Sequence, residues 1–201
     1  MVETYKRKTP LANLGLEKVS PSEQKIAKSL LMTEIPFIAK VNLRGDPANK
    51  TFLKGVKAAL NIQLPKIPNT VSGKFSQVQA IWLGPDEWLL TGRSGAEAKL
   101  LKNLHKQTEN MHVAITDITD SRTILQLSGG PALSIIMKGC TLDLHPNVFK
   151  PGQCAQTVLA KTNVIIHLLK LDKKIGPTLH IYVQNSFAEH LWLWLVDATP
   201  T

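Results

Sequence analysis

Apolar and polar residues alternate along several segments of the chain, which is the pattern of half-buried β-strands. Residues 37–43 and 122–127 both show it, and each segment is soon followed by a proline at a position where a helix can begin. We therefore expect helices over residues 47–60 and 131–139. Six further segments are predicted as strands by the same pattern: 77–83, 87–90, 114–117, 155–160, 164–169 and 179–183.

Three Ser-x-x-Glu sequences have the spacing of a capping box, in which both side chains satisfy backbone N–H groups at a helix start. They begin at Ser20, Ser94 and Ser186. The first predicts a helix that ends near Leu31. The third favours a helix over a strand for the stretch LWLWLV, and the predicted buried face of that helix carries Phe187, Leu191, Trp194 and Leu195.

The chain also contains an internal repeat. Matching residues separated by 84 positions are Leu43/Leu127, Gly45/Gly129, Pro47/Pro131, Ala48/Ala132, Lys54/Lys138, Gly55/Gly139 and Leu60/Leu144. Matching residues separated by 92 positions are Gly84/Gly176, Pro85/Pro177, Ser94/Ser186, Ala96/Ala188 and Glu97/Glu189. Because glycine and proline set backbone geometry, their recurrence predicts recurring turns. A period of this length indicates a duplicated half-domain, not a solenoid.

Together these patterns predict an α+β fold made of two halves, each with the order strand–helix–strand–strand–helix. Residues 1–35 are predicted to form an N-terminal extension with one helix. Residues 36–201 are predicted to form a single domain, with halves at about 36–110 and 111–201.

The composition limits the function classes. The chain has 24 Lys and Arg against 15 Asp and Glu, a net charge of +9, which favours an acidic partner. Nucleic acid is one such partner, but the cations are dispersed and aromatic residues make up only 5%. A solvated basic surface, or a face that docks on an acidic protein, are the other interpretations. No apolar run approaches the roughly 18 residues of a membrane span, and no secretory signal is expected.

The stretch WLGPDEWLL places Asp86 and Glu87 side by side among large apolar residues. Two such carboxylates are either an acid–base pair in an apolar pocket or the tip of a hairpin. The repeat keeps the Gly-Pro sequence but has Thr178 and Leu179 in place of the acids. This favours a structural turn, in which the two tryptophans are packing or docking aromatics.

Other candidate chemistry is sparse. Cys140, His145 and Cys154 are potential zinc ligands, and His145 is a potential base for Cys140, but their spacing matches no motif. Two free, packed thiols in a reducing cytoplasm are the alternative interpretation. The remaining candidates are expected to be turn, structural or surface residues: Asp117, Asp120, His167 and His190. We predict no catalytic, cofactor-binding or metal-binding residue in this chain.

Three stretches resemble the gamma subunit family of heterotetrameric sarcosine oxidase: WLGPDEWLL, GCTLDLHPNVFKPGQCAQTVLAK and IYVQNSFAEHLWLWLVDA. The resemblance covers most of the chain from about residue 35. It implies a fold like the folate-binding domain of aminomethyltransferase, itself built from duplicated α+β units. A related branch of that superfamily carries Lys-Gly-Cys-Tyr. Here Lys138-Gly139-Cys140 is followed by Thr141, so the activity of that branch is not carried over.

The resemblance implies a non-catalytic accessory subunit of a bacterial cytoplasmic enzyme that oxidatively demethylates sarcosine to glycine. FAD, FMN, NAD and tetrahydrofolate would be held by other subunits, and one-carbon units would pass to tetrahydrofolate. The expected partners are the alpha, beta and delta subunits, chiefly the large folate-binding subunit, without nucleic acid or membrane. The alternative is a stand-alone folate-binding or folate-dependent protein of the aminomethyltransferase type.

The loop from Asp143 to Gln153 is the predicted docking surface, because its composition is irregular and it carries an aromatic residue. The docking candidates are Asp143, His145, Pro146, Phe149 and Gln153. A tight connection between a helix and a strand is the other interpretation of the same loop.

Overall fold

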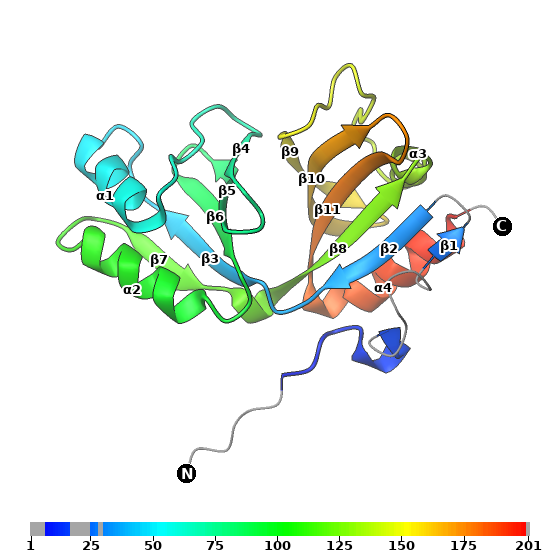
Figure 1. Cartoon of the computed structure of the whole chain (residues 1–201), viewed down its shortest axis with the longest axis horizontal. Coiled ribbons are helices and arrows are strands. Elements are labelled where there is room, and N and C mark those ends of the chain that lie inside the picture. The colour runs from blue at the N-terminus through cyan, green and yellow to red at the C-terminus, as the bar shows by residue number, and fades with distance from the viewer. Residues whose placement is uncertain (1–6, 17–24, 28–29, 200–201) are drawn as a thin grey trace, which may run out of the picture.

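Two antiparallel sheets with helices on their outer faces form the protein (Figure 1). The computed structural model describes residues 7–16, 25–27 and 30–199. The first sheet has the order β4 (Val71–Gly73), β5 (Val78–Gly84), β6 (Glu87–Gly92), β3 (Ala39–Arg44) and β7 (Ala114–Asp117). The second has the order β9 (Cys154–Leu159), β10 (Thr162–Asp172), β11 (Gly176–Gln184), β8 (Arg122–Gly129), β2 (Leu30–Ile35) and β1 (Lys25–Ala27).

The helices pack on the sheet of their own half. α1 (Lys50–Leu60) and α2 (Glu97–Gln107) cover the first sheet, while α3 (Ala132–Met137) and α4 (Asn185–Asp197) cover the second. Two short 3₁₀ helices, η1 (Ala12–Leu14) and η3 (Thr119–Ser121), complete the described elements. The α+β class is therefore confirmed.

Three apolar clusters follow from the alternation along the strands. On β3, Val41 and Leu43 point outwards and pack with Phe52 of α1. The second half has a corresponding core between its sheet and its helices. A smaller third cluster lies between the two sheets and joins Ile81 of β5 to Tyr182 of β11. The strands are thus buried on both faces near the centre of the molecule.

Each half supplies one strand to the sheet of the other. β2 precedes the first half in sequence, yet it pairs with β8 of the second sheet, with Met32 opposite Leu127. β7 lies at the start of the second half, yet it pairs with β3 of the first sheet, with Ile115 opposite Leu43. The two sheets consequently have matching strand orders, with β7 and β2 in equivalent places.

The repeated glycines explain part of the sequence repeat. A Cβ on Gly55 of α1 would lie 2.3 Å from the carbonyl oxygen of Gln107, at the end of α2. A Cβ on Gly139, just after α3, would lie 2.6 Å from the ring of Trp194 in α4. Glycine therefore recurs where the second helix of each half approaches the first.

Several local predictions were wrong. A helix was predicted from Ser20 to about Leu31. The described residues of that range instead form β1 and the start of β2. Ser20 itself lies outside the described residues. The division into an extension (1–35) and a domain (36–201) stays a prediction, although β2 is hydrogen-bonded into the second sheet.

The other two capping boxes do not form. α2 begins after Ala96 without a side-chain cap, and α4 begins after Gln184, so that Ser186 lies inside the helix. α1 begins three residues later than expected because the Asn49 side chain accepts hydrogen bonds from the N–H groups of Thr51 and Phe52, at 2.9 and 3.1 Å. The Asn49 side chain therefore caps α1, at a position that the sequence pattern did not indicate.

The last helix is confirmed, but its predicted face was partly wrong. Phe187 is 46% exposed, whereas Trp192 is 5% exposed and packs in the core. Leu191 and Leu195 are buried as expected. Among the described residues, no helix is long and apolar enough to cross a membrane.

Candidate functional site

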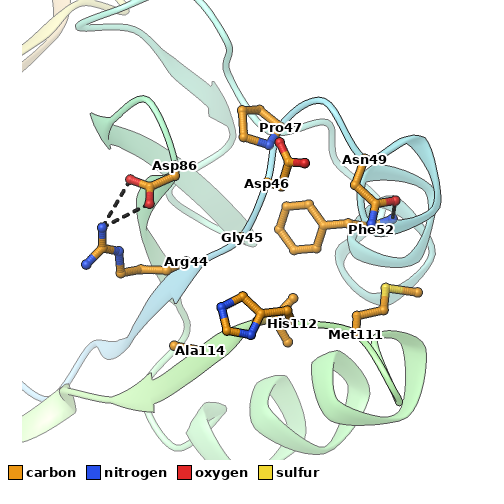
Figure 2. A pocket seen from close by; sticks show the side chains of 11 residues that line it. Arg44, Gly45, Asp46, Pro47, Asn49, Phe52, Asp86, Met111, His112 and Ala114 are labelled. Atoms are coloured by element: carbon orange, nitrogen blue, oxygen red, sulfur yellow. Dashed lines mark hydrogen bonds and ion pairs between the residues drawn. The ribbon is translucent and has the colours of Figure 1, made fainter.

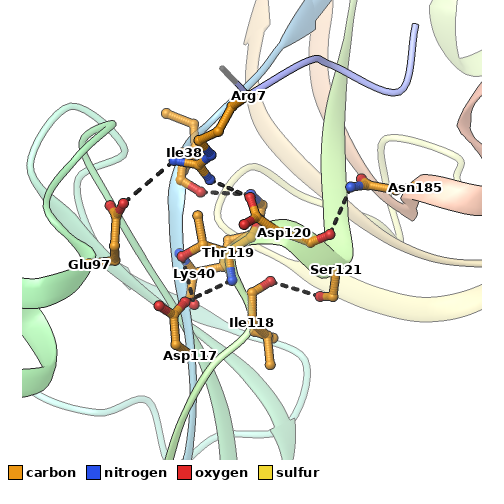
Figure 3. A network of polar contacts seen from close by, with 10 residues as sticks. All are labelled: Arg7, Ile38, Lys40, Glu97, Asp117, Ile118, Thr119, Asp120, Ser121 and Asn185. Atoms are coloured by element: carbon orange, nitrogen blue, oxygen red, sulfur yellow. Dashed lines mark hydrogen bonds and ion pairs between the residues drawn. The ribbon is translucent and has the colours of Figure 1, made fainter. Parts of the chain in front are cut away.

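The two halves are joined at the point where they exchange strands (Figure 3). Lys40 is the second residue of β3 and is fully buried, at 0% exposed. Its Nζ donates hydrogen bonds to the carbonyl oxygens of Ile38, at 2.6 Å, and Thr119, at 3.1 Å. Its backbone N–H donates to Oγ1 of Thr119 at 3.0 Å, and its carbonyl accepts from the N–H of Ile118 at 2.9 Å. Lys40 thus provides hydrogen-bond partners for main-chain groups of Ile38, Ile118 and Thr119, where the two halves meet.

Burial lowers the pKa of Lys40 to about 8, and the positive charge of Arg7 lowers it further. Three carboxylates act in the opposite direction: Asp120, Glu97 and Asp117. Sequence reasoning missed this residue. The alternation of Lys40, Asn42 and Arg44 with apolar residues indicated a solvent-facing side. Arg44 is indeed half exposed, but Lys40 is buried at the contact with Thr119 of η3.

Arg7 fixes the N-terminal segment to the same junction (Figure 3). Its guanidinium forms ion pairs with Asp120 of η3 and, at 3.5 Å, with Glu97 of α2. It also lies 5.1 Å from the ring centroid of Phe37, within the range of a cation–π contact. Arg7 therefore links the N-terminal segment, the first half and the crossing.

A histidine pair lies on the inner face of the second sheet. Nε2 of His180 and Oε1 of Gln126 are 3.1 Å apart, and the ring of Phe75 lies 4.3 Å from that of His180. Burial lowers the pKa of His167 to about 4. Burial, with the nearby His167, lowers the pKa of His180 to about 3. Both imidazoles are therefore neutral at physiological pH and too weakly basic for general base catalysis.

The two cysteines are free and buried. Burial raises the pKa of Cys154 to about 12, and its Sγ contacts the carbonyl oxygens of Thr70 and Trp82 at 3.6 and 3.7 Å. A thiol with such a pKa is a poor nucleophile. Among the described residues, no three His, Cys, Asp or Glu side chains form a group that could hold a metal, so Cys140, His145 and Cys154 are not brought together.

Asp86 and Glu87 occupy the tip of the β5–β6 hairpin, as the structural interpretation predicted. Asp86 pairs with Arg44 of β3 at 2.9 Å, in a half-exposed ion pair (Figure 2). Glu87 accepts a hydrogen bond from Nδ2 of Asn42 at 2.7 Å. Each carboxylate therefore has its own partner on β3, and the two do not share a proton.

The tryptophans of this hairpin have packing roles. Trp88 is fully buried, its Nε1 donates to the carbonyl oxygen of Pro65 at 2.8 Å, and its ring lies 6.1 Å from that of Phe52. The equivalent turn in the second half is displaced. There Asp172 pairs with Gly176 across the turn, and Pro177 lies within β11.

A pocket of about 700 Å³ opens beside the hairpin and the start of α1 (Figure 2). Arg44 and Asp86 line one side of it, and His112 lines another, beside Ala114 of β7. Its volume is in the range of small-molecule sites. No sequence motif indicated it, because its walls come from three separate segments of the chain: 44–52, the hairpin at Asp86, and 111–114.

The predicted docking loop folds on itself. Oδ1 of Asp143 accepts from the N–H of His145 at 2.9 Å, and Oε1 of Gln153 accepts from the N–H of Lys150 at 2.6 Å. Phe149 does not form an exposed tip, because it is 6% exposed and belongs to the core of the second half. The exposed part of the loop includes Asp143, His145, Pro146 and Val148.

Comparison with known proteins agrees with this architecture. A model of the family described as "Sarcosine oxidase, gamma subunit family" matches residues 44–201. The sarcosine oxidase subunit gamma of Corynebacterium sp. (strain U-96) is 30% identical over 97% of this chain and 91% of its own length. That of Corynebacterium sp. (strain P-1) is also 30% identical, with the same coverage.

Solved structures show the same relationship. A chain of heterotetrameric sarcosine oxidase from Corynebacterium sp. U-96 matches with a TM-score of 0.83 and 29% identity, covering 96% of this chain and 94% of that one. Glycine cleavage system aminomethyltransferase T from Bartonella henselae matches with a TM-score of 0.66 and 15% identity, covering 94% of this chain and 57% of that one; it shares the fold. The chain therefore belongs to the sarcosine oxidase gamma subunit family.

Proposed function

We propose that this chain is a non-catalytic accessory subunit that supports assembly of a heterotetrameric sarcosine oxidase. The observation that carries the proposal is the correspondence, over 96% of its length, with a chain of such a complex. Its partners are the alpha, beta and delta subunits, chiefly the large folate-binding subunit. Those subunits carry FAD, FMN, NAD and tetrahydrofolate in this proposal.

The chemistry of the buried groups supports an accessory role. His167 and His180 are held neutral, and burial raises the pKa of both the Cys154 thiol and the Tyr182 phenol. Each of these four side chains is less than 4% exposed. They fit a role in packing the two halves against each other.

The bacterial cytoplasm is the proposed location. Both cysteines are free thiols, which suits a reducing compartment. The loop from Asp143 to Gln153 remains a proposed docking surface, through its exposed residues Asp143, His145 and Pro146, whereas Phe149 supports the loop from below.

Co-expression tests the proposal. The four subunits are produced together from the native genes, with a tag on this chain, and compared with the purified chain and with a preparation that lacks it. We expect the partners to co-purify with the tagged chain, the chain alone to be inactive on sarcosine, and omission of the chain to reduce the recovered complex. Sarcosine oxidation by the purified chain alone would refute an accessory role.

Folate binding by the isolated chain is the second candidate. The 700 Å³ pocket beside Arg44 and His112 favours it, because that volume accommodates a small molecule. Calorimetric titration of the purified chain with tetrahydrofolate tests it. A saturable heat that disappears in an Arg44→Ala variant would support the site, and the absence of heat at high ligand concentration would eliminate it.

A further inference from the structure

A second concave surface lies on the outer side of the first half, between α1 and the segment that follows it. This α1 groove has a volume of about 490 Å³. Its apolar lining comes from Leu53 and Leu64, and its charged lining comes from the lysines Lys54, Lys57 and Lys66. It is separate from the pocket beside Asp86, with which it shares no lining residue.

No ion pair within the described part of the chain neutralises the positive charge of the α1 groove. From Pro47 to Pro85 the sequence contains five lysines and no Asp or Glu. Lys54 and Lys57 are exposed on α1, and neither forms an ion pair with another described residue. Lys66 donates to the carbonyl oxygen of Pro47 at 3.2 Å, a neutral acceptor that leaves its charge available.

The repeat provides an internal comparison. Lys138 is the counterpart of Lys54 in the second half, and its Nζ donates to the carbonyl oxygen of Ala198, at the end of α4, at 2.6 Å. Lys138 therefore donates a hydrogen bond at the C-terminal end of α4, where the helix dipole stabilises a positive charge. Lys54 has no corresponding contact among the described residues, and it faces the α1 groove instead.

An exposed apolar side chain adjoins the groove in sequence, although it is not one of the lining residues. Ile67 follows Lys66 and is 71% exposed, the largest exposed fraction of the described large apolar side chains. A small inorganic anion would use the lysines but leave the apolar lining uncovered. Nucleic acid would use the lysines too, but no aromatic side chain lines the groove for base stacking. An acidic polypeptide segment with an apolar side chain matches both features.

We propose that the α1 groove binds an acidic segment of a partner subunit, with Asp or Glu side chains at Lys54, Lys57 and Lys66 and an apolar side chain against Leu53 and Leu64. This inference rests on the proposed function, because it assumes that the chain assembles with other subunits. It adds a second contact surface, on the opposite half of the molecule from the loop at Asp143.

Paired charge reversals test the groove. Lys54→Glu/Lys57→Glu alters two exposed lysines that are three residues apart on α1. Lys99→Glu/Lys102→Glu makes the same change, at the same spacing, on exposed positions of α2. Each variant is co-expressed with the other three subunits, and the dissociation constant of the purified complex is measured at several salt concentrations. Thermal unfolding of each free chain verifies that it is folded.

The expected result is a loss of affinity of about tenfold or more for the α1 pair, with a reduced salt dependence, and a change of less than about threefold for the α2 pair. Ile67→Ser is expected to weaken binding as well, without affecting the fold, since the side chain is exposed. An unchanged dissociation constant for the α1 pair, or equal losses for both pairs, would overturn the inference. So would nuclease-sensitive association through the groove.

Failure of the proposed function gives a different result from failure of the groove. If the unmodified chain did not assemble with the other subunits, the accessory role itself would be wrong. If the unmodified chain assembles normally and the α1 pair also does, only the groove is excluded.

Discussion

Nζ of Lys40 lies 3.1 Å from the carbonyl oxygen of Thr119, across the point where the two halves of the protein exchange strands. The same Nζ donates to the carbonyl of Ile38. A buried ammonium therefore satisfies two main-chain acceptors that would otherwise be unpaired inside the protein. Lys40 thus contributes to the junction alongside the ion pairs of Arg7.

Replacement of Lys40 by methionine is expected to destabilise the protein. Methionine fills a similar volume but donates no hydrogen bond, which leaves two buried carbonyl oxygens unpaired and should lower the free energy of unfolding by about 2 kcal/mol. Urea unfolding monitored by tryptophan fluorescence measures this. Lys99→Met on the exposed face of α2 is the control, with an expected change within about 0.5 kcal/mol. Equal effects of the two substitutions would contradict the structural role of Lys40.

The buried histidines predict a loss of stability in acid. His180 has a pKa of about 3 in the folded state, against 6.5 for an ordinary histidine. As the pH falls from about 6.5 towards 3, the unfolded chain binds more protons than the folded chain does, so the free energy of unfolding decreases. One pKa unit corresponds to about 1.4 kcal/mol.

A His180→Gln variant is expected to lose less stability between pH 7.5 and pH 4.5 than the unmodified protein, because one buried titrating group is removed. Urea midpoints at the two pH values give the comparison. His105→Gln, at an exposed position, is the control variant. Identical slopes for His180→Gln and the unmodified protein would show that this imidazole does not control acid stability.

Gly55 gives a test in which helix propensity and packing oppose each other. Alanine is favoured over glycine by about 1 kcal/mol in the interior of a helix. However, its Cβ would lie 2.3 Å from the carbonyl oxygen of Gln107, which is a backbone atom. We expect Gly55→Ala to lower the melting temperature, and Gly130→Ala, whose Cβ meets no atom within 4 Å, to have a smaller effect. A raised melting temperature for Gly55→Ala would mean that α1 and α2 are not so close.

The hairpin carboxylates are expected to be dispensable for turnover. Asp86→Asn and Glu87→Gln preserve the shape of both side chains but remove their charge. In an assembled complex the rate of sarcosine oxidation should stay within about twofold, and stability should change by no more than about 1 kcal/mol, as is usual for exposed ion pairs. A loss of activity of more than tenfold in a folded complex would restore these residues as catalytic candidates.

Local patterns predicted eight of the eleven described strands, because alternation survives wherever one face of a strand packs against helices. β1, β2 and β4 were not predicted as strands. The segment 114–117 was predicted at its observed bounds, and most other strands differ by only a few residues. The capping-box spacing misled at Ser94 and Ser186, because the chain offers other helix starts nearby. Which start is used depends on how the preceding strand ends.

The arrangement of the sheets could not be predicted from the same patterns. Lys40 on β3 and His180 on β11 occupy the polar positions of alternating strands, which ordinarily face solvent. Their burial results from tertiary contacts: Lys40 contacts Thr119 of η3, and His180 of the second sheet packs against Phe75 of the first half. A polar residue does not reveal whether water or another sheet covers it, so the junction and the pocket beside Asp86 both escaped detection.

The exchange of β2 and β7 also has a consequence for synthesis of the chain. β2 emerges from the ribosome long before β8, its partner, because Met32 pairs with Leu127. The first half is complete in sequence before β2 has found its place, and such non-local pairing slows folding. During this interval β2 presents unpaired backbone groups to other chains. A newly made chain would therefore depend on prompt completion of its second half to avoid aggregation.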